Sequence, residues 1–295
     1  MKVLVTGATG FLGSHIVKQL LRENHEIIIL KRSFSDLWRI ADAMEHVASY
    51  DLDKMNNLQS LFQEQGHIDA VIHTATCYGR KNESLSRIYE TNFLFPLKLL
   101  EAAAFFNTAT FFNTDTSLYK YLNNYSLSKK HFLEVGKNFA DVGKINFINM
   151  KLEHIYGPQD DESKFVTYII KSCLANIPEL KLTKGEQKRD FIYIDDVVNA
   201  YTVLLHHAID EKRKFQEFEI GTGQAITIKE LVEKIHSLTH SSTNLNFGAL
   251  PYRENEIMES KAGNGTLIEA GWIVNSLLEK NLTKCIGDVK SEITN

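Results

Sequence analysis

Short apolar runs alternate with longer amphipathic stretches throughout the first half of the chain. Parallel strands need a connection long enough to hold a helix, so this alternation predicts successive strand-helix-strand units rather than hairpins. We therefore expect an α/β protein with a doubly wound parallel sheet. The runs expected to form its buried strands are Lys2–Thr6, Glu26–Leu30, Ala70–His73, Thr110–Asn113 and Asn146–Met150.

The alternation ends after about residue 155, where Gly157-Pro158 and a polar stretch follow. A chain of 295 residues can form one large domain or two closely packed ones. We expect residues 1–155 to form the sheet domain, which the chain re-enters at about 190–230. A smaller α/β C-terminal lobe would contain residues 156–189 and 231–295.

The composition argues against several classes of partner. The formal net charge of −4 offers no general attraction to nucleic acid or to a membrane surface. The three cysteines lie far apart in the sequence, which fits reduced thiols better than a disulfide framework. No apolar run approaches the ~20 residues of a membrane span. We therefore expect a cytoplasmic protein that binds a small molecule.

A glycine-rich segment, Thr6–Gly13, joins the first expected strand to the first expected helix with the spacing GxxGxxG. Glycines permit a tight turn and a close backbone approach, and a helix N-terminus offers unpaired N–H groups to a pyrophosphate. An ordinary strand-to-helix turn is the alternative, but the position directly after the first strand favours a dinucleotide site in a Rossmann domain. The residues expected to contact the cofactor are Gly7, Thr9, Gly10, Phe11, Leu12 and Gly13.

The turn after the second expected strand, Lys31-Arg32-Ser33, indicates which dinucleotide binds. A site specific for NAD usually places an acidic residue there for the ribose 2′-hydroxyl, and this turn has none. Arg32 and Ser33 are expected to bind a 2′-phosphate instead, so the sequence favours NADP(H). A solvated basic turn would leave the choice open. Asp51 and Leu52 are expected near the adenine, although they could equally begin a loop.

Tyr125 and Lys129 are four residues apart, which places both side chains on one face of a helix. A phenol with a pKa of ~10 donates protons efficiently at neutral pH only when nearby positive charge stabilises the phenolate. Tyr50 and Lys54 have the same spacing. Position separates the two pairs, because Tyr125 follows the strand that ends near Asn113, at the edge of the sheet where ligands bind. We expect Tyr125 and Lys129 to be catalytic.

Several hydroxyl groups follow the same strand, in the segment Asn113-Thr114-Asp115-Thr116-Ser117. One of them is expected to hydrogen-bond the substrate oxygen that receives the proton from Tyr125. Such segments are also common in turns. The sequence leaves the choice between Thr114 and Thr116 open.

Taken together, these features resemble the extended short-chain dehydrogenase/reductase family over nearly the whole chain. The resemblance also draws on His73-Thr74-Ala75-Thr76, Asn92 and Tyr156-Gly157-Pro158. It implies that Thr74, Ala75 and Thr76 lie along the cofactor and that Asn92 supports the active site. It further implies proton donation by Tyr125, and contact of Lys129 with both the nicotinamide ribose and the tyrosine.

Within this family, Cys77-Tyr78-Gly79-Arg80 and the run after Asn113 are most similar to the CDP-abequose and CDP-paratose synthases. The resemblance implies NADPH-dependent reduction of the C4 ketone of a CDP-4-keto-3,6-dideoxyhexose, for the O-antigen of bacterial lipopolysaccharide. Alignment with the paratose enzymes favours Thr116 over Thr114. The related 4,6-dehydratases have a glutamate directly after the aspartate, where this chain has Thr116, so dehydration is not expected.

Two arginines are expected to bind the substrate diphosphate, because guanidinium groups match phosphate oxygens. Each lies in a segment that resembles one in sugar-nucleotide enzymes. They are Arg189, in Gly185–Tyr193, and Arg253, in Arg253–Met258. Core packing or a solvated surface is the alternative for the remaining candidates. The residues also considered for sugar or cytosine contact are Tyr78, Arg80, His154, Lys164 and Phe165.

No metal site is predicted, because His236 and His240 share a helical face without a third ligand, and His206-His207 is interpreted as a helix end. An epimerase that retains its NAD is the first alternative function. A non-catalytic NADP-sensing regulator is the second, although the Tyr125/Lys129 pair is present. The family's frequent dimers are compatible with a homodimer. The sequence sets neither the oligomeric state nor the face of C4 that is reduced.

Overall fold

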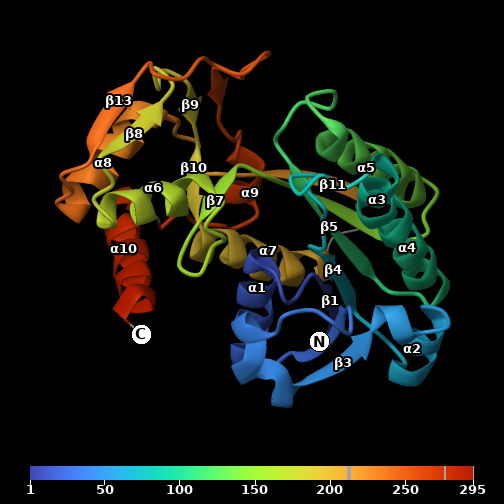
Figure 1. Ribbon diagram of the computed structural model, residues 1–295. Coiled ribbons are helices and arrows are strands. Elements are labelled where there is room, and N and C mark those ends of the chain that lie inside the picture. The colour runs from blue at the N-terminus through green and yellow to red at the C-terminus, as the bar shows by residue number, and fades with distance from the viewer. Residues whose placement is uncertain (211–213, 276, 295) are drawn as a thin grey trace. The chain divides into compact units, whose positions relative to one another are not determined.

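The chain divides into two compact units in the computed structural model, which describes residues 1–210, 214–275 and 277–294 (Figure 1). Unit 1 comprises Met1–Leu152 and Val198–Glu219, and unit 2 comprises Glu153–Val197 and Ile220–Asn295. None of the helices in the described ranges is both long enough and apolar enough to cross a membrane.

Unit 1 is built on a seven-stranded parallel sheet with the strand order β11-β6-β5-β4-β1-β2-β3. The expected doubly wound α/β fold is therefore confirmed. All five strands expected from the sequence are present, but three of them extend beyond their apolar runs into polar residues, because parallel pairing continues there. The strands are β1 (Lys2–Thr6), β2 (Glu26–Lys31), β3 (Val47–Asp51), β4 (Ala70–His73), β5 (Thr110–Thr116), β6 (Asn146–Leu152) and β11 (Phe215–Ile220).

Helices form the crossovers of this sheet, and α3, α4 and α5 lie side by side in Figure 1 (teal to green). Helix α1 packs on β1 and β2, whereas α5 packs on β5 and β6. The connection between β4 and β5 also contains a π-helical turn at Glu90–Leu94, and 3₁₀ segments span Trp38–His46 and Leu52–Lys54. The helices are α1 (Phe11–Arg22), α2 (Gln59–Gln65), α3 (Leu85–Tyr89), α4 (Phe95–Phe105), α5 (Asn124–Asp141) and α7 (Ile194–Asp210).

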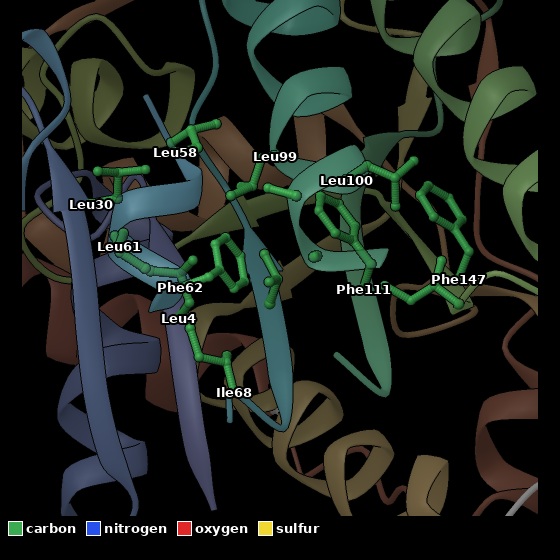
Figure 2. Packing of buried hydrophobic residues seen from close by; sticks show 14 of the residues in the cluster. Leu4, Leu30, Leu58, Leu61, Phe62, Ile68, Leu99, Leu100, Phe111 and Phe147 are labelled. Atoms are coloured by element: carbon green, nitrogen blue, oxygen red, sulfur yellow. The ribbon is translucent and has the colours of Figure 1, made fainter. Parts of the chain in front are cut away.

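The core of unit 1 fills the space between the sheet and the helices α2, α4 and α5 (Figure 2). The rings of Phe111 and Phe147, on neighbouring strands, stack with centroids 5.7 Å apart. Gly136 lets α5 approach these rings, because a Cβ there would lie 2.1 Å from the Phe147 ring. Close packing of this kind holds α5 rigidly against β5 and β6.

The order of the strands reverses between β1 and β4, since β2 and β3 lie on one side of β1 and β5 and β6 lie beyond β4. Loops that leave the carboxyl ends of such a pair diverge, and ligands of doubly wound sheets bind between them. The glycine loop follows β1, and Thr74–Thr76 follow β4. The sheet therefore places two of the expected cofactor segments at its ligand-binding edge.

Unit 2 combines short strands with four helices in its described part. Phe191–Tyr193 pairs with His154–Tyr156 rather than with the large sheet. The structure divides the chain after residue 152 and returns to unit 1 over 198–219, whereas the sequence predicted a boundary at 155 and a return at about 190–230. The elements are β7 (His154–Tyr156), α6 (Phe165–Leu174), β8 (Glu179–Leu182), β9 (Lys188–Arg189), β10 (Phe191–Tyr193), β12 (Ile226–Thr227), α8 (Ile228–Thr239), β13 (Asn244–Phe247), β14 (Glu259–Ser260), α9 (Gly265–Glu269) and α10 (Leu278–Thr294).

Candidate functional site

The glycine loop forms a tight turn between β1 and α1. Gly7 has a φ of +71°, which favours glycine, and its carbonyl accepts the Gly10 N–H at 2.9 Å. A Cβ on Gly13 would lie 2.2 Å from the Gly7 oxygen, so the turn requires glycine there as well. Gly10 is the N-cap of α1 and offers no capping side chain, and the first turn contains no acidic residue. The loop therefore presents a helix N-terminus suited to a pyrophosphate.

The turn after β2 lies beside carboxylates that follow or end β3. The Ser33 hydroxyl donates to Asp53 Oδ2 at 2.6 Å, and the Ser33 N–H donates to Asp53 Oδ1 at 2.7 Å. These hydrogen bonds lower the pKa of Asp53. Asp51 forms an ion pair with Lys31, and Leu52 begins the following 3₁₀ segment. The tertiary structure thus places acidic groups next to a turn that contains none in the sequence.

Arg32 is exposed at the same turn. Its guanidinium lies over the ring of Phe34, 4.8 Å from the ring centroid. Among the described residues, no carboxylate pairs with this guanidinium. Arg32 therefore keeps its donors available for an anion, whereas Ser33 is already bonded to Asp53.

The segment after β4 is tied both to the glycine loop and to α5. Thr74 Oγ1 donates to the Thr6 carbonyl at 2.8 Å, and a Cβ on Gly7 would lie only 2.6 Å from it. Asn92, in the π-helical turn, is fully buried. Its Oδ1 accepts from Thr76 Oγ1 (3.2 Å) and the Cys77 N–H (2.7 Å), and its Nδ2 donates to Ser128 Oγ (3.0 Å). Asn92 thereby joins the segment of Thr76 to the residue that precedes Lys129.

A capping box determines where α5 begins. The Asn123 side chain accepts the Ser126 N–H at 2.9 Å, and Ser126 Oγ accepts the Asn123 N–H at 3.2 Å. Tyr125 therefore lies in the first turn, and Lys129 lies one turn later on the same face. The helical pairing of these two residues agrees with the spacing in the sequence.

Tyr125 is partly buried and has three of the expected site residues around it. The Tyr78 ring lies 5.0 Å from the Tyr125 ring, and the Arg80 guanidinium lies 5.2 Å from the Tyr78 centroid. Burial, followed by Tyr78 and Asp115, raises the pKa of Tyr125 well above 10, while a hydrogen bond with Thr116 and the charge of Arg80 lower it. Tyr125 is accordingly protonated at neutral pH. Its pKa is raised rather than lowered, contrary to the expectation that nearby positive charge stabilises the phenolate, because burial outweighs the charge of Arg80.

Lys129 is a buried cation, with 2% of its surface exposed. No hydrogen bond or ion pair joins its ammonium to any residue that the structure describes. The pKa of Lys129 falls to about 8, chiefly because of burial and to a smaller extent because of the like charge of Lys130, while Asp115 acts in the opposite direction. A buried donor without a protein partner fits a group that binds a cofactor ribose.

The structure separates the two candidate threonines. The Thr114 hydroxyl lies 2.7 Å from the hydroxyl of Tyr201 on α7, where both groups are buried. The Thr116 hydroxyl instead lies close enough to Tyr125 to lower the pKa of its phenol. The geometry therefore favours Thr116 as the hydroxyl that acts together with Tyr125.

Asp115 lies between these threonines but serves a separate buried network. Its Oδ2 accepts from Lys130 Nζ at 2.6 Å and from Asn149 Nδ2 at 3.1 Å. Lys130 Nζ also donates to the Thr116 carbonyl at 2.8 Å. Sequence reasoning missed Lys130, Asn149 and the Thr114 partner Tyr201. The position of Lys130 directly after Lys129 was the only signal for it.

In unit 2, the guanidinium of Arg189 is largely buried and paired. Its Nη2 lies 2.5 Å from Glu256 Oε1, and its Nη1 donates to the Lys188 carbonyl at 2.8 Å. Burial lowers the pKa of Arg189, and the nearby charge of exposed Arg253 lowers it slightly as well. The two expected phosphate-binding arginines therefore lie near one another, and Glu256 neutralises one of them.

The other substrate candidates of unit 2 occupy two places. The His154 ring packs on Phe191 with centroids 5.7 Å apart, and its Nδ1 lies 3.4 Å from Glu153 Oε2. Lys164 is the N-cap of α6, and Phe165, the first residue of that helix, is 37% exposed.

Comparisons with known proteins agree with this architecture. The model of the NAD dependent epimerase/dehydratase family matches residues 3–221. A CDP-abequose synthase from Salmonella muenchen is 37% identical over 292 residues, which cover 97% of each chain. The CDP-abequose synthase from Salmonella typhimurium is 35% identical over 292 residues, 96% of this chain and 97% of the relative.

Solved structures show the same fold at low identity. A Stenotrophomonas maltophila UDP-glucose-4-epimerase with bound NAD and formylated UDP-arabinopyranose has a TM-score of 0.88 at 19% identity, covering 100% of this chain and 99% of that one. A Thermotoga maritima UDP-glucose 4-epimerase with UDP-glucose has a TM-score of 0.86 at 21% identity, covering 99% of this chain and 100% of that one. Both likenesses support the fold.

Proposed function

Because the chain belongs to the NAD dependent epimerase/dehydratase family, we propose that it reduces the C4 ketone of a CDP-4-keto-3,6-dideoxyhexose with NADPH. The observation that carries this proposal is the likeness to two CDP-abequose synthases along almost the whole chain. Thr116 beside Tyr125 supports a reductase, since one proton donor and one hydroxyl are sufficient for that chemistry. The product would enter bacterial O-antigen synthesis.

The dinucleotide would be held at the edge of the sheet where the strand order reverses. The N-terminus of α1 would bind the pyrophosphate, and Lys129 Nζ would donate to the nicotinamide ribose. Arg32 would bind the 2′-phosphate through its exposed guanidinium. When bound, NADPH supplies the hydride that carbon C4 receives.

Tyr125 completes the reduction at oxygen O4. As C4 gains a hydride, O4 gains negative charge, and Tyr125 Oη transfers its proton there so that the ketone becomes an alcohol. The Thr116 hydroxyl would donate to the same oxygen and hold it in line with Tyr125. Tyr78, next to the Tyr125 ring, would cover one side of the sugar and exclude water.

Asp115 argues against dehydration. Its Oδ2 accepts from Lys130 and Asn149, and Thr116 follows it where a 4,6-dehydratase would have a glutamate. The substrate diphosphate would bind Arg253 and, after displacement of Glu256, Arg189. The homodimer and the cytoplasmic location stay predictions.

An epimerase that retains NAD is the second candidate, and the position of Asp53 favours it. A carboxylate hydrogen-bonded to Ser33 lies where the 2′-hydroxyl of NAD could find an acceptor. Arg32 at the same turn favours NADPH. The choice of dinucleotide is therefore the property that separates the two candidates.

The decisive experiment supplies CDP-4-keto-3,6-dideoxyglucose and NADPH to the purified chain and determines the C4 configuration of the product by NMR. We expect one equivalent of NADPH to be consumed for each alcohol formed. Tyr125→Phe should lower kcat by about 10²- to 10⁴-fold and leave NADPH affinity unchanged. A preparation that carries stoichiometric NAD and consumes no NADPH would instead support the epimerase.

A further inference from the structure

A cluster of two histidines and a glutamate lies in unit 1, away from the residues discussed so far. Glu23 and His25 connect α1 to β2, and His206 lies near the end of α7. One ligand atom from each residue lies within 4.8 Å of the other two, and His25 Nε2 is 3.6 Å from Glu23 Oε2. His25 precedes β2, so the cluster lies at the amino edge of the sheet, opposite the glycine loop.

Three polar atoms of this cluster have no hydrogen-bond partner among the described residues, although two of them, His25 Nε2 and Glu23 Oε2, face each other at 3.6 Å. The His25 side chain is 7% exposed, and neither of its ring nitrogens has a hydrogen-bond partner among the described residues. Glu23 Oε2 is likewise buried without one. Buried polar atoms are nearly always hydrogen-bonded, and an exception calls for an explanation such as an ion.

Two hydrogen bonds orient the other ligands. His206 Nδ1 lies 2.8 Å from the Thr202 carbonyl, which only accepts, so Nδ1 carries the proton and a neutral His206 presents an unprotonated Nε2. Gln19 Nε2 donates to Glu23 Oε1 at 2.7 Å, which leaves Oε2 for a ligand. Metal-bound histidines and carboxylates are commonly anchored in this way through their second atom.

We propose that Glu23, His25 and His206 bind one Zn²⁺ ion, with water as the fourth ligand. Two imidazole nitrogens and a carboxylate oxygen form a common zinc donor set. Tetrahedral ligands at about 2.0–2.2 Å from zinc lie roughly 3.3 Å apart, so ligand atoms that now lie up to 4.8 Å apart would move together by up to about 1.5 Å. The ion would join the end of α1 to α7 on one face of the sheet. Its role is structural, because the residues proposed for reduction lie at the opposite edge.

The test uses the full-length chain stripped of metal by a chelator. Zn²⁺ is titrated in competition with a chromophoric chelator, and Co²⁺ reports the geometry through its visible spectrum. We expect one equivalent to bind, a tetrahedral Co²⁺ spectrum, and a Tm raised by about 5 °C at a free Zn²⁺ concentration 100 times the Kd.

His206→Asn is the main variant, because His206 is exposed and its replacement does not disturb the core. It should weaken Zn²⁺ binding by at least about tenfold, remove the Tm shift and leave kcat unchanged. His240→Asn is the matched control, since His240 has a φ of 52°, which asparagine tolerates, and lies outside the cluster. Equal Zn²⁺ affinity in both variants, or absence of binding to the unaltered chain, would overturn the proposal.

Discussion

Lys129 in unit 1 and Arg189 in unit 2 are both buried cations, yet their surroundings differ. Lys129 is 2% exposed and Arg189 is 8% exposed. Glu256 neutralises Arg189, whereas no carboxylate in the described parts of the chain pairs with Lys129. Burying an unpaired charge is unfavourable, which is why the pKa of Lys129 falls to about 8. An unpaired buried cation indicates a place prepared for a ligand, and a paired one indicates a contact that a ligand must displace.

The largest expected effect comes from removing the partner of Arg189. Glu256→Gln should lower the free energy of unfolding by about 3 kcal/mol, because it leaves a buried guanidinium without its carboxylate. Urea denaturation measures this loss. The double variant Arg189→Met/Glu256→Leu should regain most of it, since neither charge remains. A loss below about 0.5 kcal/mol in the single variant would place the pair among weak surface contacts.

Lys129→Met should have the opposite effect on stability. The folded-state pKa of Lys129, about 8, lies below its ordinary value of 10.5. The unfolded chain therefore binds more protons between these pH values, and the penalty of the buried ammonium is full below pH 8 and disappears as pH rises toward 10.5. The variant should gain about 2 kcal/mol at pH 7 and progressively less above pH 8, while reduction is lost.

Urea denaturation of both chains at pH 7 and pH 9.5 checks the sign of this change. Lys18→Met, at a more exposed lysine, serves as the control and should change stability little at either pH. Destabilisation of Lys129→Met at pH 7 would mean that Lys129 has a partner in the folded chain. Lys129 and Arg189 would then both be paired cations, and the difference between their surroundings described above would be wrong.

Replacement of Thr114 or Thr116 should have smaller effects, and these effects should differ between the two positions. Thr116→Val should reduce kcat about tenfold, because it removes one hydrogen bond to the reacting oxygen. Thr114→Val should leave kcat within about twofold and instead lower stability, since its hydroxyl pairs with buried Tyr201. Steady-state kinetics with thermal unfolding distinguishes the two. Reversed effects would assign the catalytic hydroxyl to Thr114.

Arg32 is an exposed cation, unlike the buried Lys129 and Arg189. Its replacement should have the smallest effect of these substitutions. Arg32→Ala should weaken NADPH binding roughly five- to tenfold and leave NADH binding unchanged, because only NADPH has a 2′-phosphate. Dissociation constants from fluorescence titration provide the measurement. Equal loss for both cofactors would indicate that Arg32 does not determine cofactor preference.

The sequence alone predicted the parallel sheet, the glycine loop at its first turn, and the helical pairing of Tyr125 with Lys129. Each of these depends on residues close together in the chain: an apolar run, a glycine spacing, and a separation of four. Strand ends were less predictable, because pairing between neighbours extends β5 to Thr116 beyond its apolar residues.

Only the tertiary structure decided which groups meet across long stretches of chain. It paired Thr114 with Tyr201, 87 residues away, and Arg189 with Glu256, 67 residues away. It also placed His206, which the sequence indicated only as a helix end, beside His25. Local spacing determines a helix face or a turn, but the partners of a buried charge or hydroxyl depend on how distant segments pack, and no short pattern encodes that packing.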